Sequence, residues 1–337
     1  MNKIFEQDIE NITKNFDMSI FYGKTILITG ATGLIGKLCA KSLLKGTNTK
    51  VIALVRNIEK AKKIFETNSN LEFLVQDINN NINLEQEVDY IIHTASVTSS
   101  ADFVQKPVET ILTAIEGTKN VLEFAKKQNK LKGMVYLSSL EVYGTQSKEN
   151  IKESDYGFID ILTLRSSYSE SKKLVETLCI SYGNEYNIPV KIARLSQTFG
   201  AGVEKNDNRV FAQFCKSVIN KENIILHTKG ETKRNYCYTT DAVRGIFTIL
   251  AKGENNQAYN IANKNTYISI SDMAKSLENK NTKVVFEIDN KDRGFNPTVK
   301  ICLNTEKLES LGWSAELDLP QMFERTIKSM REENEQN

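Results

Sequence analysis

The stretch from Lys24 to Gly36 reads KTILITGATGLIG, and the fold of the chain can be predicted from it. Its first six residues, with three consecutive apolar residues from Ile26 to Ile28, predict a buried strand. Three evenly spaced glycines follow, and residues 37–44 then have the composition of a helix. Glycines permit a tight turn close to a ligand, and the start of a helix offers free N–H groups to a pyrophosphate. The order of strand, glycine turn and helix therefore favours a dinucleotide-binding site over an ordinary tight turn.

Further apolar runs alternate with helical stretches through the first 195 residues, as expected of a parallel sheet with helices on both faces. We predict an α/β fold: a Rossmann-type, doubly wound parallel sheet over residues 23–195, with a strand near 258–263 returning to its edge. Apolar residues at helical spacing predict a helical extension over residues 1–22. The regular alternation of strands and helices ends after residue 195, which predicts a smaller, mixed α/β substrate-binding domain over residues 196–337.

Residues at the ends of the next strands complete the predicted cofactor site. Arg56 stands where sites selective for NAD usually carry an acidic residue, so it favours NADP slightly over NAD, with a plain surface arginine as the alternative. A carboxylate after the third strand can meet the adenine amino group, and small residues after the fourth leave room beside the ribose and nicotinamide. The predicted cofactor contacts are Gly30, Thr32, Gly33, Leu34, Ile35, Gly36, Arg56, Asp77, Ile78, Thr94, Ala95, Ser96, Tyr168 and Lys172.

Composition excludes several other classes of protein. The chain has 337 residues, 40% of them hydrophobic, which is enough for a buried core. Its net charge of +2 provides no field for nucleic acid or membrane, and the short, interrupted apolar runs lead us to expect a soluble, cytoplasmic protein. The five cysteines are far apart without a CxxC pair, which predicts reduced thiols. With two histidines, a multi-histidine metal site is excluded, and we expect no metal.

The candidate catalytic group is the pair Tyr168 and Lys172, together with Ser139 at the end of a predicted strand. Residues four apart on a helix share one face, so the ammonium is expected to lie beside the phenol and to lower its pKa toward neutrality. The serine hydroxyl would bind the same substrate oxygen. Such a group transfers a proton while an alcohol is oxidised or a ketone is reduced, which requires a hydride carrier nearby.

These motifs in their order along the chain resemble the extended short-chain dehydrogenase/reductases, and within them the NAD(P)-dependent nucleotide-sugar epimerases and dehydratases. The resemblance extends from Gly23 to about Leu319. It implies that Tyr168 is the general acid/base, that Lys172 holds the nicotinamide ribose, and that Ser139 binds the reacting oxygen. The motifs that carry it are Gly30-x-x-Gly33-x-x-Gly36, Asp77-Ile78, Ser138-Ser139-x-Glu141-Val-Tyr-Gly144 and Tyr168-x-x-x-Lys172.

The C-terminal half is similar to the segments with which this family binds a sugar nucleotide, most of all to those of UDP-glucuronate decarboxylases. The resemblance implies that Arg209 and Arg234 hold the diphosphate, a task for which the guanidinium fork is suited. For each arginine alone, an internal salt bridge is the alternative. The substrate-binding residues so predicted are Ser139, Gln197, Arg209 and Arg234, and Gln197 stands where relatives usually have asparagine.

One departure from the family pattern bears on the reaction. Sugar 4,6-dehydratases have Asp-Glu ahead of Val-Tyr-Gly, whereas this chain has Leu140-Glu141, so the acid that would protonate the leaving hydroxyl is missing. Dehydration is therefore disfavoured. Glu141 is a candidate catalytic base near C5, with a structural carboxylate as the alternative.

The leading hypothesis is an epimerase that transiently oxidises C4 of a nucleotide-diphosphate sugar, as in nucleotide-sugar metabolism for cell-surface polysaccharides. The family resemblance also leads us to expect a homodimer. A UDP-glucuronate decarboxylase-like enzyme and an NADPH-dependent 4-ketosugar reductase remain as enzymatic alternatives. A non-catalytic NADP-sensing regulator is the alternative outside enzymes, and the presence of the Tyr-x-x-x-Lys pair argues against it.

Overall fold

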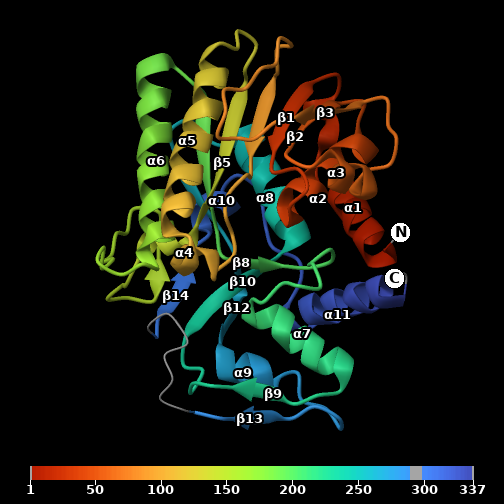
Figure 1. Cartoon of the computed structure of the whole chain (residues 1–337), viewed down its shortest axis with the longest axis vertical. Helices are drawn as coiled ribbons and strands as arrows, with labels where there is room; N and C mark the ends of the chain where they lie inside the picture. Colours follow the sequence, from red (N-terminus) through yellow and green to blue (C-terminus); the bar gives the residue numbers. More distant parts are fainter. Residues whose placement is uncertain (1, 289–297, 336–337) are drawn as a thin grey trace.

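A seven-stranded, entirely parallel sheet is the centre of the molecule in the computed structural model, which describes residues 2–288 and 298–335 (Figure 1). The strand order β11-β7-β5-β4-β1-β2-β3 reverses direction at β1 and β4, which makes the sheet doubly wound. The predicted Rossmann-type fold is confirmed. The strands are β1 (Thr25–Thr29), β2 (Lys50–Val55), β3 (Leu71–Val75), β4 (Tyr90–His93), β5 (Gly133–Ser139), β7 (Val190–Leu195) and β11 (Ala258–Ile261).

Alternate residues of these strands enter two separate apolar cores. Along β1, Ile26 and Ile28 face one core and Leu27 faces the other, as the two-residue period of a strand requires. Both faces are covered, so the strands are apolar on both sides. The helices on the Ile26 side are α1 (Lys3–Asn15), α2 (Leu34–Gly46), α3 (Ile58–Ile64) and α8 (Thr239–Lys252), and those on the other are α5 (Pro107–Lys126) and α6 (Ser166–Tyr186).

Helix α8 is not among the helices predicted from the sequence. Every residue from Thr239 to Leu250 is buried, because the helix lies between the large sheet, α1 and α2. Its polar residues Asp241, Arg244 and Thr248 recur at helical spacing, but the first two form an ion pair inside the protein. Although α8 follows residue 195, it packs against the large sheet together with α1 and α2.

The rest of the chain forms a smaller body at the carboxyl ends of the large sheet (Figure 1). One sheet has the order β12-β10-β14-β6 with β8 paired to β10, and a separate pair joins β13 to β9. The strands are β6 (Asn150–Ile151), β8 (Gln197–Phe199), β9 (Ile224–Leu226), β10 (Lys233–Tyr238), β12 (Asn263–Ser269), β13 (Val284–Phe286) and β14 (Lys300–Leu303). The helices of this smaller body are α7 (Val210–Asn220), α9 (Ile270–Lys275) and α11 (Leu319–Glu335). By contrast, α4 (Asp102–Gln105) packs on α5 and α6, and α10 (Glu306–Glu309) packs on β11 and α8. The 3₁₀ turn at Met18–Phe21 belongs to the main core, and a second one lies at Leu140–Tyr143.

The two ends of the described chain lie side by side. Helix α1 packs against α11, as the red and blue helices of Figure 1 show. Asn2 caps α1 with its side-chain oxygen and donates its amide Nδ2 to Ser329 Oγ of α11, 2.7 Å away. Helix α1 also packs on α2 and α8, so it is part of the main core. Within the described residues, no helix is long and apolar enough to cross a membrane.

Candidate active site

The turn after β1 needs glycine at two positions, and the absence of side chains there leaves room for a ligand. Gly30 has φ +66°, and a Cβ there would lie 2.8 Å from the backbone nitrogen of Ala95. A Cβ on Gly36 would lie 2.4 Å from the carbonyl oxygen of Gly30, so the helix can approach the strand only without one. Gly33 precedes α2 without a side-chain cap, which leaves the first N–H groups of the helix free for a phosphate. These residues fit a dinucleotide.

The predicted strand-end residues lie around this turn. Thr94, directly after β4, donates its hydroxyl to the carbonyl oxygen of Thr29 at 2.8 Å, which joins the ends of β4 and β1. The side chain of Asp77 caps a turn by accepting the N–H of Asn79, and Ile78 is buried. Arg56 is exposed at the end of β2. All are at the carboxyl edge of the sheet, where ligands bind in folds of this type.

Ser139 and Tyr168 meet at the same edge. Ser139 ends the central strand β5, and Tyr168 is in the first turn of α6, which packs on β5. The side chain of Ser139 lies near enough to the phenol to lower the pKa of Tyr168 in part, and its Oγ accepts the N–H of Glu141 at 3.2 Å. A small substrate hydroxyl placed between them would contact both groups, which is the arrangement that proton transfer to or from one oxygen needs.

The ring of Tyr168 is held by two residues that sequence reasoning missed. It stacks on Phe103 of α4 with ring centroids 4.1 Å apart and an interplanar angle of 14°. The guanidinium of Arg165 lies over the Phe103 ring, 4.6 Å from its centroid. Arg165 precedes Tyr168 by three residues, so helical spacing could have indicated it. Phe103 comes from a distant segment, and no local pattern indicates its role.

The expected effect of Lys172 on Tyr168 is wrong for this structure. Burial raises the pKa of Tyr168, the charge of Glu141 raises it further, and the hydrogen bond from Ser139 lowers it only in part. Lys172 lies over the Tyr168 ring at 5.7 Å, but its Nζ donates to the carbonyl oxygen of Leu137, 2.8 Å away. Burial lowers the pKa of Lys172 itself to about 8, although the charge of nearby Glu176 raises it. An ammonium buried with its own partner does less for the phenol than spacing alone suggests.

Glu141 is paired in this structure. It accepts hydrogen bonds from Arg165 Nη2 at 2.6 Å and from Ser169 Oγ at 3.0 Å. The Nη1 of Arg165 is buried without a hydrogen-bond partner among the described residues. The carboxylate therefore stands beside Tyr168 as part of an ion pair, with one guanidinium nitrogen still able to donate.

The two candidate phosphate-binding arginines differ in their surroundings. Arg209, at the start of α7, donates from Nη2 to Asp207 Oδ2 at 2.6 Å and stacks on Phe211 at 4.7 Å. Its charge is the smallest of the influences named on the pKa of Tyr168, which it lowers. Arg234, on β10, has a buried Nε with no hydrogen-bond partner among the described residues. A buried guanidinium N–H without a partner is costly unless a ligand satisfies it.

Gln197 begins β8, which pairs in parallel with β10, so it stands on the same small sheet as Arg234. Ser139, Tyr168 and Lys172 come from the large sheet and its helix, whereas the arginines come from the smaller body. The structure brings Ser139, Tyr168 and Lys172 together. The arginines lie on β10 and at the start of α7, so the structure places them apart from that group in the chain and in the fold.

A dinucleotide cradle beside a Ser-Tyr-Lys group is the architecture of the extended short-chain dehydrogenases and reductases. The model of the NAD dependent epimerase/dehydratase family matches residues 26–262, and the chain belongs to this family of enzymes. The match begins at β1 and ends just after β11, so α1 and α11 lie outside it.

The comparisons with individual proteins agree with the family. UDP-glucuronic acid decarboxylase 4 of Arabidopsis thaliana is 28% identical over 91% of this chain and 68% of its own length. UDP-glucuronic acid decarboxylase 1 of Xenopus tropicalis is 27% identical over 93% of this chain and 73% of its own.

Solved structures show the same fold at lower identity. An epimerase of Methanothermobacter thermautotrophicus superposes with a TM-score of 0.82 at 22% identity, covering 98% of this chain and 97% of its own. UDP-glucuronic acid 4-epimerase of Bacillus cereus in complex with NAD superposes with a TM-score of 0.75 at 22% identity, covering 91% and 99%.

Proposed function

We propose that this enzyme transiently oxidises C4 of a nucleotide-diphosphate sugar and returns the hydride to give an epimer. The observation that carries the proposal is that Ser139 at the end of β5 and Tyr168 in the first turn of α6, which packs on β5, meet at the carboxyl edge of the sheet that also holds the glycine turn. A proton-transfer group at that place is of use only to a reaction that also moves a hydride.

The chain's own residues would act as follows. Ser139 and Tyr168 orient the C4 oxygen, and Tyr168 takes its proton as the hydride leaves C4 and returns the proton in the second half of the cycle. Lys172 and Arg165, with centres 5.7 and 5.9 Å from the Tyr168 ring centroid, stabilise the phenolate that forms. The nicotinamide cofactor, held by the glycine turn, supplies the hydride acceptor when it is bound. NADP remains slightly favoured because Arg56 is exposed at the end of β2, although the family is NAD dependent.

Arg234 and Arg209 would hold the diphosphate. The unsatisfied Nε of Arg234 and the position of Arg209 at the start of α7 support this assignment. Epimerisation also requires the 4-ketose to expose its other face to the hydride. A substrate held mainly by its diphosphate, at a distance from C4, would leave the sugar free to turn.

Decarboxylation of a nucleotide-linked uronic acid is the second candidate. It shares the first step, because a ketone at C4 places the C6 carboxylate in the β position from which CO₂ leaves readily. The pair of Glu141 and Arg165 beside Tyr168 favours it, since Arg165 Nη1 is still free to donate to a carboxylate. The decarboxylases among the relatives also support it.

One experiment separates these reactions. The purified protein is incubated with a panel of UDP-hexoses and UDP-hexuronic acids, with and without added NAD and NADPH, and the products are identified by mass and by chromatography. We expect a product of unchanged mass and altered retention time, formed without consumption of cofactor. Loss of CO₂ would establish the decarboxylase instead, and net oxidation of NADPH would establish a ketosugar reductase. No product from any sugar nucleotide would overturn the proposal.

We also propose that the enzyme is a homodimer. Helices α5 and α6 lie side by side and expose Val108, Leu112 and Leu174, an apolar face flanked by charges of both signs such as the pair Glu116 and Lys119. Such a face suits a second copy of the same surface. Analytical ultracentrifugation tests this: the wild type should sediment as a dimer and Leu112→Glu as a monomer, and a monomeric wild type would contradict it.

A further inference from the structure

Residues 200–209, called here the 200–209 segment, connect β8 to α7 and end at Arg209. Its backbone is fixed near the start by two hydrogen bonds. The N–H of Ala201 donates to the hydroxyl of Tyr238 at 3.2 Å, and the N–H of Gly202 donates to Ser329 Oγ at 3.2 Å. Both acceptors belong to other elements, so the path of the segment depends on where those elements are held.

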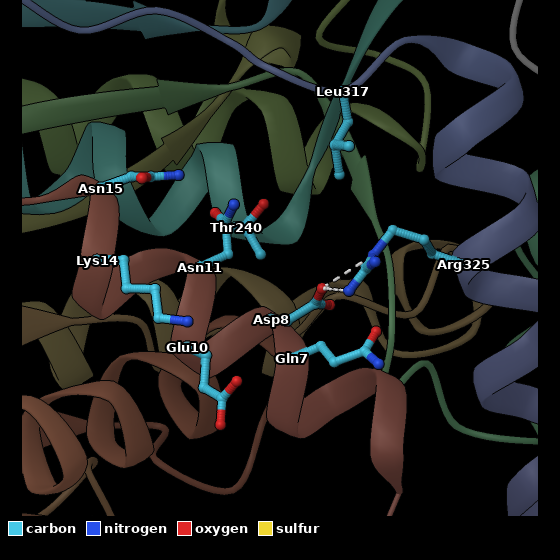
Figure 2. A pocket seen from close by; sticks show the side chains of 9 residues that line it. All are labelled: Gln7, Asp8, Glu10, Asn11, Lys14, Asn15, Thr240, Leu317 and Arg325. Carbon is cyan, nitrogen blue, oxygen red and sulfur yellow. Dashed lines mark hydrogen bonds and ion pairs between the residues drawn. The ribbon is translucent and has the colours of Figure 1, made fainter.

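Asp8 of α1 binds the first of these acceptors, the hydroxyl of Tyr238. The side chain of Asp8 is 1% exposed, and the Tyr238 hydroxyl donates to its Oδ2 at 2.9 Å. Arg325 of α11 donates to Asp8 Oδ1 from Nη2 at 2.6 Å and from Nε at 3.1 Å, as the dashed lines of Figure 2 indicate. Because Tyr238 donates to a carboxylate, its oxygen is left as the acceptor for Ala201.

The second acceptor is also connected to α1. Ser329 Oγ accepts the amide of Asn2 at 2.7 Å as well as the N–H of Gly202. Asp8 of α1 and its N-cap Asn2, both outside the family match, thus bind the two acceptors that hold the segment, Tyr238 and Ser329.

We propose that Asp8 is a positioning residue for the active site: through Tyr238 it fixes the 200–209 segment, and through the segment it fixes Arg209 at the start of α7. This inference rests on the proposed role of Arg209 in holding the substrate diphosphate. Asp8 itself does not touch the substrate.

A pocket of about 290 Å³ connects Asp8 with solvent. It lies between α1, the start of α8 and α11, as Figure 2 shows, and its lining includes Asn11, Thr240 and Arg325. The side-chain oxygens Asn11 Oδ1 and Thr240 Oγ1 have no hydrogen-bond partner among the described residues. Polar atoms of this kind suit water, which would carry protons to and from Asp8.

Asp8 can therefore respond to pH. Burial raises its pKa from 3.8 to about 6, while Arg325 and Tyr238 lower it and the charge of Asp241 on α8 raises it. Glu10 and Lys14 of α1 itself line the same pocket, and on the α2 side Lys37 and Lys41 lie over the ring of Phe5. As the pH falls through about 6, Asp8 becomes neutral, and the charge-assisted bonds to Tyr238 and Arg325 weaken.

Protonation of Asp8 weakens its local bonds to Tyr238 and Arg325, but it increases the global stability of the fold. A carboxyl whose pKa is raised on folding binds more protons in the folded state, so its contribution to stability falls as the pH rises from about 4 to about 6. A neutral isostere should therefore be tolerated. We expect Asp8→Asn at pH 7 to keep the wild-type Tm or to raise it, while the 200–209 segment becomes less ordered.

Hydrogen exchange followed by mass spectrometry tests the positioning without any substrate. In Asp8→Asn the amides of residues 200–209 should exchange about three- to tenfold faster than in the wild type, the loss expected for one weakened hydrogen bond. Tyr238→Phe should do the same. Glu10→Gln, on the exposed side of the same helix, should leave the exchange unchanged. Wild-type exchange of this segment in both Asp8→Asn and Tyr238→Phe would overturn the proposal.

Kinetics test the consequence for the active site. The KM of the wild type for its sugar nucleotide should rise about three- to tenfold as the pH falls through 6, whereas the KM of Asp8→Asn should be raised already at pH 7 and should show no step near pH 6. A parallel step in the mutant would overturn the role of Asp8. If the wild type binds no nucleoside diphosphate, the proposed function fails, yet the exchange experiment still decides whether Asp8 orders the segment.

Discussion

The two halves of the candidate site are built in different ways. Ser139, Tyr168 and Lys172 stand on β5 and α6, two elements packed directly against each other in the main core, and the Nζ of Lys172 lies 5.7 Å from the centroid of the Tyr168 ring. Arg209 and Arg234 stand at a loop end and on a strand of the smaller body, where one is bonded to Asp207 and the other has an unsatisfied nitrogen. The comparison indicates that the reacting groups are preorganised, whereas the substrate-holding groups complete their contacts when the ligand arrives.

Loss of the Tyr168 hydroxyl should give the largest effect, because it removes the proton-transfer group of the preorganised half. We expect Tyr168→Phe to lower kcat by about 10²- to 10⁴-fold with little change in cofactor affinity. Tyr182→Phe is the matched control, since Tyr182 lies on the same helix and donates to Glu123 on the surface of α5. Steady-state kinetics on both variants decide the matter, and more than about a tenth of wild-type kcat in Tyr168→Phe would place the proton transfer elsewhere.

Removal of Arg234 should give the next largest effect and should act on binding. Arg234→Ala is expected to weaken UDP binding by about 1.5 to 3 kcal/mol, because the buried guanidinium has no other partner for its Nε. The change should appear in KM and leave kcat nearly unaltered, since the diphosphate is remote from C4. Calorimetry with UDP measures it, with the exposed Lys229→Ala as control. Equal affinity in wild type and Arg234→Ala would contradict the phosphate-binding role.

Removal of Arg209 should cost less, about 0.5 to 1.5 kcal/mol of UDP binding. Its guanidinium is already bonded to Asp207, so a bound phosphate must replace Asp207 or share the guanidinium with it. The net gain in binding free energy is therefore smaller. The same calorimetric titration gives the value. A larger loss in Arg209→Ala than in Arg234→Ala would reverse the ranking and make Arg209 the main phosphate ligand.

Substitution of Arg56, which is exposed at the end of β2, should change only the choice of cofactor and leave the binding of the sugar nucleotide unaltered. Arg56→Asp should shift the ratio of NADP to NAD affinity toward NAD by about tenfold, because a carboxylate repels a 2′-phosphate and accepts bonds from a ribose diol. Fluorescence titration with each reduced cofactor measures the ratio. The same ratio before and after the substitution would show that Arg56 is an ordinary surface residue.

Local spacing was enough to predict the fold class. The glycine turn directly follows its strand, and Tyr168 and Lys172 are four residues apart, so backbone geometry alone relates the members of each motif. The family and its enzymatic nature could be predicted from the same motifs, and the family model confirms both.

Other features depend on contacts between distant segments, and no local pattern records them. Phe103 reaches Tyr168 because α4 packs against α6, and the polar residues Asp241 and Arg244 of α8 are buried because α8 packs between the large sheet, α1 and α2. The pKa of Tyr168 was mispredicted for the same reason: proximity to a lysine can be read from spacing, whereas desolvation depends on everything that packs around the ring.

The sequence by itself determined a Rossmann-type enzyme with a Ser-Tyr-Lys group, because those features follow from short-range geometry. The tertiary structure alone decided that Glu141 is paired with Arg165, that Arg209 is already bonded to Asp207, and that Asp8 is buried beside Tyr238. The physical reason is that hydrogen bonding and burial are set by which surfaces meet. For Asp8 and Arg325 the partners are 317 residues apart in the chain and become neighbours only when α1 packs against α11.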